Sequence, residues 1–466
     1  MSLSDYHASI ARKAVSFEPR GLADVPALSS SLKPHQAHCV DFALRAGSAA
    51  LFLDTGLGKT FAALEWGRVI VEHTNRPVLM LAPLAVAGQH QREAERFGID
   101  AKAIREPSEI TGARVYITNY DRLAKFDASA FGGVILDESS ILKGMGGRTS
   151  SALIADFART PFKLACTATP APNDHSELGQ HAEFLGALSA TQMLTRWFLH
   201  DSADTGTWRM KGHAVRDFWS WVASWARCVS TPSDIGFSDD GYVLPSLDLT
   251  RHVVKADRSL DPGAEKDGQA RLFRIPDTSA TAIHREKRMT ADARAELIAQ
   301  AVAREADEPW VVWCDTDYEA DALAALMPDA IEVRGSMSPD EKEYRLTAFS
   351  TGRASKIITK PSVAGYGLNW QHCARMGFAG LSFSYENYYQ AIRRCWRFGQ
   401  ERTVQVHIAC ADTEEAIWNV VSRKAGDHDA MKAEMAAAMR RAVRIEREQA
   451  AYLPRQPLNL PDWIAA

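Results

Sequence analysis

The chain has 466 residues, 46% of them hydrophobic and 24% charged, and its formal net charge at pH 7 is −4. This length allows roughly three domains, and the composition is that of an ordinary globular protein with ample apolar residues for large cores. Because the net charge is slightly negative, a nucleic-acid partner would have to be bound by a local basic groove rather than by bulk charge.

Cysteine usage and apolar runs exclude two further classes of protein. The seven cysteines are scattered along the chain without a C-x-x-C pair, which indicates reduced intracellular thiols rather than a zinc site or a disulfide framework. No charged and then apolar leader opens the sequence, and no apolar run approaches the ~18 residues that a membrane span needs. We therefore expect a cytoplasmic protein without a membrane-spanning segment.

The first part of the chain contains short apolar runs that are typical of buried parallel strands. They lie at residues 49–54, 78–82, 115–118, 133–137 and 162–166. Amphipathic stretches lie between them, for example from Thr60 to Glu72. Strands that alternate with helices predict an α/β fold with a doubly wound sheet.

The segment 188–290 differs in composition and contains five of the twelve tryptophans. Trp221 and Trp225 are four residues apart and would share one face of a helix. We expect a helical insertion with a small aromatic core of its own, in preference to a platform on which nucleic-acid bases stack.

A second series of apolar runs follows and predicts a second sheet of the same kind. These runs lie at residues 310–314, 330–333, 356–359 and 404–409. Beyond residue 425 the chain is rich in Ala, Met, Glu and Arg as far as Gln449, which predicts a helix on propensity. For 452–466 we expect an extended segment that Trp463 pins to the body of the protein or to a protein partner.

A glycine-rich turn between the first strand and the first helix predicts a phosphate-binding loop. Its backbone N–H groups and the helix N-terminus would together cradle phosphate oxygens. Lys59 would place a point charge on the outer phosphates, and the Thr60 hydroxyl would bind the metal ion. Leu53 stands where the strict phosphate-loop pattern has its first glycine. The residues expected to contact the nucleotide here are Thr55, Gly56, Leu57, Gly58, Lys59 and Thr60.

A phosphate loop needs a metal-binding carboxylate on a neighbouring strand, and the run 133–137 ends in one. Asp137 would hold Mg²⁺, and Glu138 would orient the attacking water. Two acidic residues often end a strand, so the pair alone is only moderate evidence for a metal site. Together with the phosphate loop it becomes strong evidence.

Three further features narrow the class of nucleotide-binding protein. Gln36 can offer both a donor and an acceptor to the edge of an adenine. Thr167 and Thr169 follow the last strand of the first block and could sense the γ-phosphate. The segment 361–370 has glycines where a backbone must come close to another group. Each feature is weak alone, because any loop can contain such residues.

Taken in order, these motifs resemble the superfamily 2 helicases, and most closely the Swi/Snf-type ATPases in their compact bacteriophage-encoded forms. The resemblance runs from about Leu32 to Glu415 and rests on motifs that include "LKPHQ", "DTGLGKT", "VILDESSILKG", "TATPAPND", "PSVAGYGLNW" and "QAIRRCWRFGQ". It implies two RecA-like lobes, each a parallel sheet flanked by helices. It also implies ATP and Mg²⁺ as cofactors and, for a phage protein, the cytoplasm of the bacterial host.

The resemblance gives the arginines near residue 394 a role. In that family the last motif faces the γ-phosphate across the cleft between the lobes, and Arg394 and Arg397 fall on its two arginine positions. Their guanidinium groups would neutralise charge on the transferring phosphoryl group. Arg393 stands where the family usually has Asp, and we expect it to belong to a solvated basic face or to contact the phosphate backbone. Ser139 also departs from the family ending of the acidic motif, which puts the coupling to nucleic acid in doubt.

The remaining site residues are implied by the resemblance alone. Further nucleotide contacts are expected at Gly367 and Asn369, coupling between ATP and nucleic acid at Thr167, Thr169 and Gln390, and nucleic-acid contacts at Pro83, Thr118, Asn119, Gly335, Ser336 and Ser362. The motif ends in Gly399-Gln400 rather than in the Gly-Arg typical of RNA helicases, which favours duplex DNA bound through its phosphates, independently of sequence.

The expected division of the chain is an N-terminal extension (1–27), a first lobe (28–187), a helical insertion (188–290), a second lobe (291–425) and a C-terminal helix with a tail (426–466). Three functions remain open, and we expect a monomer in each case. The first is an ATP-driven translocase on duplex DNA, the second a strand-separating helicase, and the third an ATP-switched clamp on DNA or on a partner.

Overall fold

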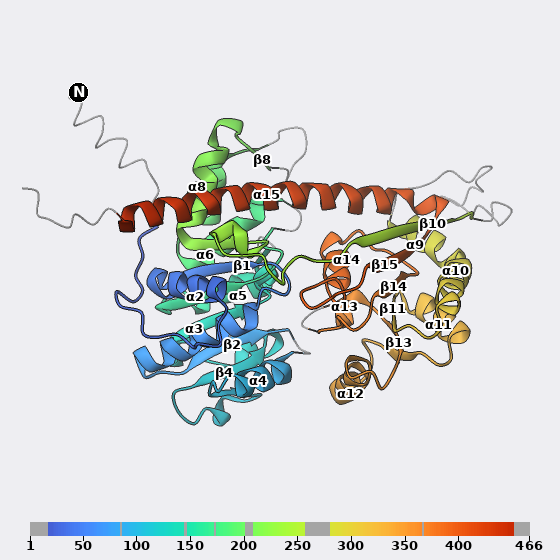
Figure 1. Cartoon of the computed structure of the whole chain (residues 1–466), viewed down its shortest axis with the longest axis horizontal. Helices are drawn as coiled ribbons and strands as arrows, with labels where there is room; N and C mark the ends of the chain where they lie inside the picture. Colours follow the sequence, from blue (N-terminus) through green and yellow to red (C-terminus); the bar gives the residue numbers. More distant parts are fainter. Residues whose placement is uncertain are drawn as a thin grey trace, which may run out of the picture.

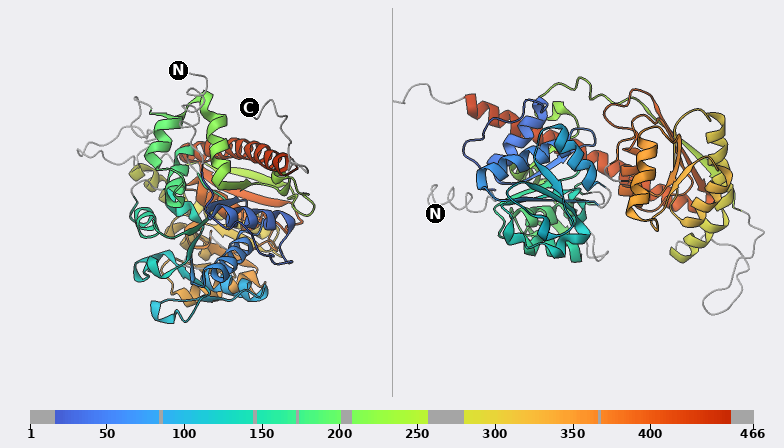
Figure 2. Two further views of the ribbon diagram at one scale, coloured as in Figure 1. Left: turned by 90° about the vertical axis from the view of Figure 1, so that its left-hand side faces the viewer. Right: turned by 90° about the horizontal axis from the view of Figure 1, so that it is seen from below.

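Two parallel sheets, far apart in sequence, form the centres of two lobes that lie side by side under one long helix (Figures 1 and 2). The computed structural model describes residues 17–83, 86–143, 147–171, 174–200, 208–256, 280–365 and 368–451, with only the backbone for 280–284 and 446–451. The expected tail segment 452–466 and Gly367 lie outside the described residues.

The first lobe has a seven-stranded sheet in the order β3-β4-β2-β5-β6-β1-β9, in which all pairs are parallel. The strands are β1 (Ser48–Leu53), β2 (Val78–Ala82), β3 (Ala101–Ala103), β4 (Val115–Asn119), β5 (Gly133–Asp137), β6 (Phe162–Cys166) and β9 (Ala226–Val229). Its helices are α2 (Pro34–Ala46), α3 (Lys59–Thr74), α4 (Ala87–Arg96), α5 (Arg148–Asp156), α6 (Leu178–Leu185), α7 (Ala190–Trp197) and α8 (Val215–Trp225). The five strands predicted here are confirmed, and their continuous apolar runs are buried because helices cover the sheet.

The second lobe has a six-stranded parallel sheet in the order β10-β15-β14-β11-β13-β12. The strands are β10 (Leu247–Val254), β11 (Trp310–Trp313), β12 (Ile331–Val333), β13 (Lys356–Thr359), β14 (Arg375–Phe378) and β15 (Val404–Ala411). The helices are α9 (Ala280–Met289), α10 (Ala291–Arg304), α11 (Asp317–Leu326), α12 (Pro339–Ser350), α13 (Pro361–Ala364) and α14 (Tyr385–Ile392). The predicted α/β fold with two RecA-like lobes is therefore present.

The described residues of the segment 188–290 do not form a separate unit, which differs from the expectation. Strand β9 pairs with β1 at the edge of the first sheet, and β10 pairs with β15 at the edge of the second. Trp221 and Trp225 belong to the same buried cluster as the sheet of the first lobe, so the predicted independent aromatic core is wrong. The short antiparallel hairpin of β7 (Phe198–His200) and β8 (Trp208–Met210) belongs to neither of these two sheets.

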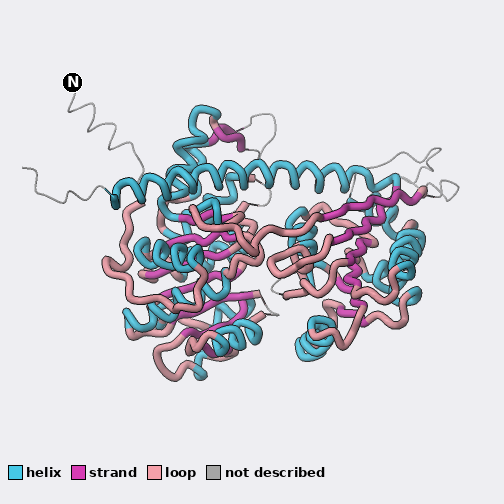
Figure 3. Tube along the Cα trace, in the orientation of Figure 1, coloured by secondary structure: helices cyan, strands magenta, loops and turns pink. Residues whose placement is uncertain are grey.

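Helix α15 (Glu415–Ala451) confirms the predicted C-terminal helix and runs across both lobes (Figures 1 and 3). Ile417 and Val421 pack in the core of the second lobe. Met431, Met435 and Met439 pack in the core of the first lobe. One continuous helix therefore connects the two cores directly. None of the helices that the structure describes combines the length and the apolar character that a membrane span requires.

Candidate active site

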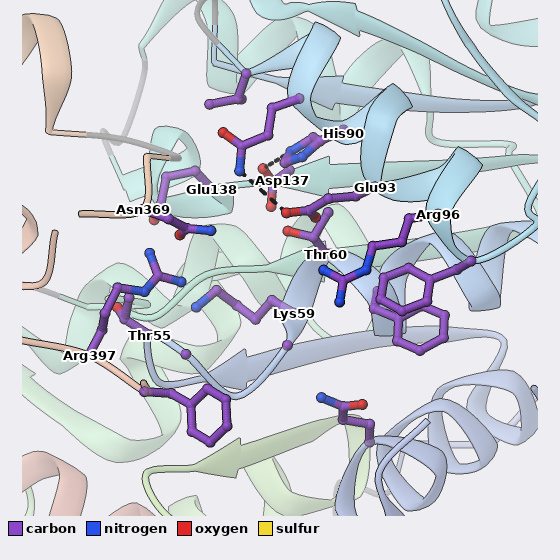
Figure 4. A pocket seen from close by; sticks show the side chains of 18 of the residues that line it. Thr55, Lys59, Thr60, His90, Glu93, Arg96, Asp137, Glu138, Asn369 and Arg397 are labelled. Atoms are coloured by element: carbon purple, nitrogen blue, oxygen red, sulfur yellow. Dashed lines mark hydrogen bonds and ion pairs between the residues drawn. The ribbon is translucent and has the colours of Figure 1, made fainter. Parts of the chain in front are cut away.

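A cavity of about 490 Å³ lies between the lobes and is lined by residues of both (Figure 4). Most of the predicted nucleotide and catalytic residues line it: Gln36, Thr55, Gly56, Gly58, Lys59, Thr60, Asp137, Glu138, Asn369, Gln390, Arg394 and Arg397. The sheet order explains how the first lobe contributes, because β5, β6 and β1 are neighbours. Their carboxyl ends bring the acidic pair, the threonine motif and the glycine-rich turn to one edge.

The glycine-rich turn joins β1 to α3 with two residues in the left-handed region. Gly56 has φ +96° and Gly58 has φ +81°, where a side chain would be strained. A Cβ atom on Gly58 would lie 2.1 Å from the Gln36 Nε2 atom, and one on Gly56 would lie 2.7 Å from the Phe398 Cβ atom. The turn is thus packed against α2 on one side and against the second lobe on the other.

Lys59 begins α3 and reaches back over the turn. Its ammonium donates to the carbonyl oxygen of Leu53 at 2.7 Å. Burial lowers the pKa of Lys59, while the negative charges of Glu138, Asp54 and Asp137 act in the opposite direction. An ammonium held in this way, at the N-terminus of a helix, is suited to bind the outer phosphates of a nucleotide.

Asp137 ends β5 and is held from two sides. His90 of α4 lies with its Nε2 atom 2.6 Å from Asp137 Oδ2, and the hydroxyl of Tyr120 donates to the Asp137 carbonyl oxygen at 2.8 Å. Desolvation opposes protonation of His90, but the charge of Asp137 and the hydrogen bond to it raise the His90 pKa above its ordinary value. His90 therefore fixes the orientation of the predicted metal ligand.

Glu138 adopts φ +59°, a left-handed conformation that is uncommon for a residue with a side chain. Its Oε1 atom accepts hydrogen bonds from the hydroxyl groups of Thr167 and, at 3.2 Å, Ser140. Burial raises the pKa of Glu138, opposed by Lys59 and Thr167. Such backbone strain at a carboxylate that faces a cavity is typical of functional sites, and the hydroxyl groups of Thr167 and Ser140 hold the carboxylate in place.

The threonine motif continues this network into the interior. The Thr167 hydroxyl oxygen accepts the backbone N–H of Thr169 at 3.0 Å. Thr169 is fully buried, and its hydroxyl has no hydrogen-bond partner among the described residues. Behind Glu138, the hydroxyl of Ser139 is 3.1 Å from the Nε2 atom of the buried His181. Thr167 therefore contacts the predicted water-positioning carboxylate directly, and Thr169 is connected to it through Thr167.

The side-chain amide of Gln36 is fixed by two hydrogen bonds, one at its oxygen and one at its nitrogen. Its Oε1 atom accepts the backbone N–H of Lys33 at 2.9 Å, and its Nε2 atom donates to the Leu57 carbonyl oxygen at 3.0 Å. An amide oxygen can accept a second hydrogen bond and an amide nitrogen can donate a second. Gln36 can thus meet the edge of a base while it braces the turn.

The two predicted arginine-finger residues converge on the cavity from the second lobe. Arg394 is buried and donates to the carbonyl and side-chain oxygens of Gln390 at 3.0 and 2.9 Å. Arg397 is partly exposed at the cavity, on the side of Asn369 and Lys59 (Figure 4). Desolvation, with repulsion from Arg394 and Arg393, lowers the pKa of Arg397 to about 9. A bound anion would relieve this repulsion.

Arg393 is not part of a solvated basic face, so that expectation is wrong. Only 5% of its side chain is exposed, and its Nη2 atom is 2.9 Å from Asp54 Oδ1. The same nitrogen donates to the Thr55 carbonyl oxygen at 3.1 Å. Because its counter-charge comes from the first lobe, Arg393 joins the lobes rather than facing solvent.

A second cavity, of about 410 Å³, separates α4 and β4 of the first lobe from α12 of the second. Four basic side chains line it, namely Arg92, Arg105, Arg122 and Lys342, together with two acidic ones, Asp340 and Glu343. Thr118 and Asn119 line it too, and the Thr118 Oγ1 and Asn119 Oδ1 atoms are buried without a hydrogen-bond partner among the described residues. Gln89 lines both cavities, and the adjacent residues Leu368 and Asn369 line the second and the first cavity respectively.

The other residues predicted to contact nucleic acid are more scattered. Pro83 lines the first cavity rather than the second. Gly335, Ser336 and Ser362 are exposed on the second lobe. No pattern in the sequence indicated a role for His90, Tyr120 or the partners of Asp54, because each contacts a residue in another segment of the chain. The only local hint was that α4 follows the strand next to β5.

The donor set at one end of the first cavity fits Mg²⁺. Thr60 and Asp137 offer a hydroxyl and a carboxylate oxygen, which are hard ligands of the type that Mg²⁺ prefers. A nucleotide-bound Mg²⁺ needs only one or two protein ligands, because phosphates and water complete its shell. The His90 contact is on Asp137 Oδ2, so the carboxylate orientation is set without a metal.

Comparisons with known proteins agree with this geometry. Residues 293–399 match the family model described as the helicase conserved C-terminal domain, and this range includes Arg394 and Arg397. The DNA annealing helicase and endonuclease ZRANB3 of Mus musculus is 23% identical, over 85% of this chain and 40% of its own length. The chain thus spans less than half of that relative. Both matches support a helicase-like nucleic-acid motor of superfamily 2.

Proposed function

We propose that the protein is an ATP-hydrolysing motor of Swi/Snf type that moves along duplex DNA without reading its sequence. The observation that carries the proposal is the cavity between the lobes, in which Lys59 of the first lobe and Arg397 of the second face one space. A site assembled from two lobes is completed when they close, so ATP binding and hydrolysis can drive their relative motion.

Each group has a role in phosphoryl transfer. The turn from Thr55 to Thr60 binds the phosphates, and Gln36 selects adenine through its remaining donor and acceptor. Mg²⁺, held by Thr60 and Asp137, would neutralise charge on the phosphate oxygens. Glu138 orients the attacking water and accepts its proton. Arg394 and Arg397 stabilise the charge that develops in the transition state.

The second cavity is the proposed path of the DNA backbone. Its basic residues come from both lobes, so a bound duplex would contact both and would be moved when they shift. Contacts to phosphates do not depend on the DNA sequence, and the affinity that they provide falls as the salt concentration rises. Gln89 lies in both cavities and offers a route by which DNA binding affects hydrolysis.

The test compares ATP and GTP hydrolysis in the presence of linear duplex DNA, single-stranded DNA and RNA of equal length, with Lys59→Ala as the inactive control. Translocation is measured as displacement of a third strand from a triplex, and strand separation as unwinding of a forked duplex. We expect duplex stimulation, preference for ATP, triplex displacement and no fork unwinding. Unwinding of the fork would favour a helicase, and slow hydrolysis unaffected by DNA would favour an ATP-switched clamp.

A further inference from the structure

The carboxylate of Asp54, directly before the phosphate loop, has partners from two distant parts of the chain, the end of α14 and the middle of α15. Its Oδ1 atom accepts a hydrogen bond from the Tyr389 hydroxyl at 2.6 Å and lies 2.9 Å from Arg393 Nη2. Its Oδ2 atom accepts a hydrogen bond from Lys432 Nζ at 2.9 Å. Tyr389 is on α14 of the second lobe, and Lys432 is on α15.

This cluster is compact and largely removed from solvent. The Asp54 side chain is 11% exposed and that of Lys432 is 19% exposed. Lys432 Nζ also donates to the Tyr389 hydroxyl oxygen at 2.8 Å, so the members contact one another. Desolvation alone would raise the pKa of Asp54, but Arg393 and Lys432 hold it well below its usual range. The carboxylate is therefore ionised, and each cation depends on it for charge compensation.

Asp54 transmits its position to the phosphate loop through short contacts. Its Oδ1 atom accepts the backbone N–H of Thr55 at 2.6 Å. Its backbone carbonyl oxygen is 3.4 Å from Lys59 Nζ, which also donates to the preceding carbonyl, that of Leu53. A displacement of the Asp54 side chain would thus shift both the start of the turn and the acceptors that orient Lys59.

Lys432 occupies the point where α15 crosses from one lobe to the other. Its neighbour Met431 packs in the core of the first lobe, whereas Val421, three turns earlier, packs in the core of the second. Glu434 accepts a hydrogen bond from Trp219 Nε1 at 2.8 Å, which fixes the helix on the first lobe. The Lys432 ammonium therefore reaches Asp54 from a helix that packs on both lobes.

We propose that Lys432 is a positioning residue of the nucleotide site, which sets the conformation of the phosphate loop through Asp54 and couples nucleotide binding to the docking of α15. This inference rests on the proposed function, because it assigns the cavity to a nucleotide. Neither Lys432 nor Tyr389 lines that cavity, so their effect passes through Asp54. Coupling of this kind is reciprocal: nucleotide strengthens the docking of α15 by the factor by which docking strengthens nucleotide binding.

The experiment titrates the full-length chain with a fluorescent ATP analogue in the presence of excess Mg²⁺. Lys432→Met keeps the aliphatic stem and removes the charge, and Lys432→Arg keeps the charge. The matched control is Arg423→Met on the same helix, where the side chain is 65% exposed and pairs with Asp427. We expect Lys432→Met to raise the Kd by roughly 5- to 150-fold, the usual range for coupled sites. Lys432→Arg should recover most of the affinity, and Arg423→Met should match the wild type.

Hydrogen exchange of the α15 amides from 427 to 436 distinguishes coupling from a purely structural role of Lys432. If Lys432 only stabilised the fold, its substitution would not abolish the effect of the nucleotide on this exchange. We expect the nucleotide to slow this exchange in the wild type and not in Lys432→Met. Tyr389→Phe, which removes only a hydroxyl, should raise the Kd in the same direction and serves if Lys432→Met does not fold. A variant with lower thermal stability but wild-type Kd and wild-type nucleotide protection overturns the inference. A wild-type chain that binds no nucleotide overturns the proposed function, and this inference with it.

Discussion

Arg394 and Arg397 donate to the same acceptor, the carbonyl oxygen of Leu368, at 2.9 and 3.1 Å. Two guanidinium groups that share one acceptor repel each other, and the cavity beside them is where an anion would compensate their charge. Leu368 itself lines the second cavity. Ligand binding in the second cavity that moves Leu368 would therefore also move the two arginines at the first cavity.

The first prediction concerns these arginines. Arg397→Ala should lower kcat by roughly 10³- to 10⁵-fold, because a finger of this kind acts on the transition state, and should leave ATP binding almost unchanged. Arg397→Lys should restore little, since a point charge lacks the planar fork. Arg394→Ala should lower the rate similarly or somewhat less. Single-turnover hydrolysis at saturating DNA, beside a nucleotide-binding titration, separates the two steps. A wild-type single-turnover rate in Arg397→Ala would show that the arginine is only part of a basic surface.

The second prediction concerns Glu138. Glu138→Gln keeps the side-chain volume and an oxygen that can accept from Thr167, but it removes the base that takes the proton of the attacking water. This variant should bind ATP and lose hydrolysis by at least ~10²-fold, whereas Lys59→Ala should lose binding itself. The check is a pair of measurements on each variant, equilibrium binding of ATP and steady-state turnover. Full turnover by Glu138→Gln would mean that another group positions the water.

Local chemistry made much of the fold and the site predictable. The strands at 78–82 and 133–137 are unbroken apolar runs, and such runs are buried only between layers of helix. The phosphate loop and the Asp137-Glu138 pair need particular residue types at fixed spacing, so the sequence displays them. Strand β14 was missed because Arg375 and Gly377 break up its apolar run, which leaves only Met376 and Phe378 as large apolar residues.

Contacts between distant segments were not predictable in the same way. Nothing near Arg393 indicates that its counter-charge is Asp54, which is 339 residues away by the numbering of the two residues. The same holds for His90 on α4, whose partner Asp137 ends β5, the third strand after that helix. The spacing of Trp221 and Trp225 predicts that they share one face of a helix, but it does not indicate which element this face packs against. The face packs on the first lobe, so the two residues do not form a separate core.

The third prediction follows from the contact between His90 and Asp137. His90→Phe should raise the Mg²⁺ concentration needed for half-maximal hydrolysis by about 10- to 100-fold, the usual cost when a group that orients a metal ligand is lost. The exposed His213, on the first lobe away from the cavity, provides the matched control as His213→Phe. Mg²⁺ titration of ATP hydrolysis at saturating ATP measures the effect. An unchanged Mg²⁺ requirement in His90→Phe would show that Asp137 is held well enough by the backbone.

The fourth prediction concerns the arginines that line the second cavity. For the wild type, the logarithm of the DNA-binding constant should fall linearly with the logarithm of the salt concentration, with a slope of about −0.9 per phosphate contact. Arg122→Ala and Arg105→Ala should each weaken binding on every duplex sequence and make the slope less steep by about 0.9. Arg423→Ala, on the exposed side of α15, should change neither quantity. If the wild type and the three variants show the same dependence of binding on salt, the DNA does not bind in the second cavity.

The last prediction concerns stability in acid and the buried His181. Desolvation, opposed by hydrogen bonds, lowers the pKa of His181 to about 4. The unfolded chain would protonate this residue near pH 6.5, whereas the folded chain would not, so the unfolded state binds more protons between these values. Its contribution to stability is present above pH 6.5 and is lost as the pH falls toward 4, by roughly 3 kcal/mol in total. His181→Gln keeps a polar group near Ser139 but does not titrate, so its free energy of unfolding should fall less steeply across this range. Urea unfolding at several pH values, with His213→Gln as the control, measures both slopes. Parallel curves for the wild type and His181→Gln between pH 6.5 and 4 would contradict this assignment.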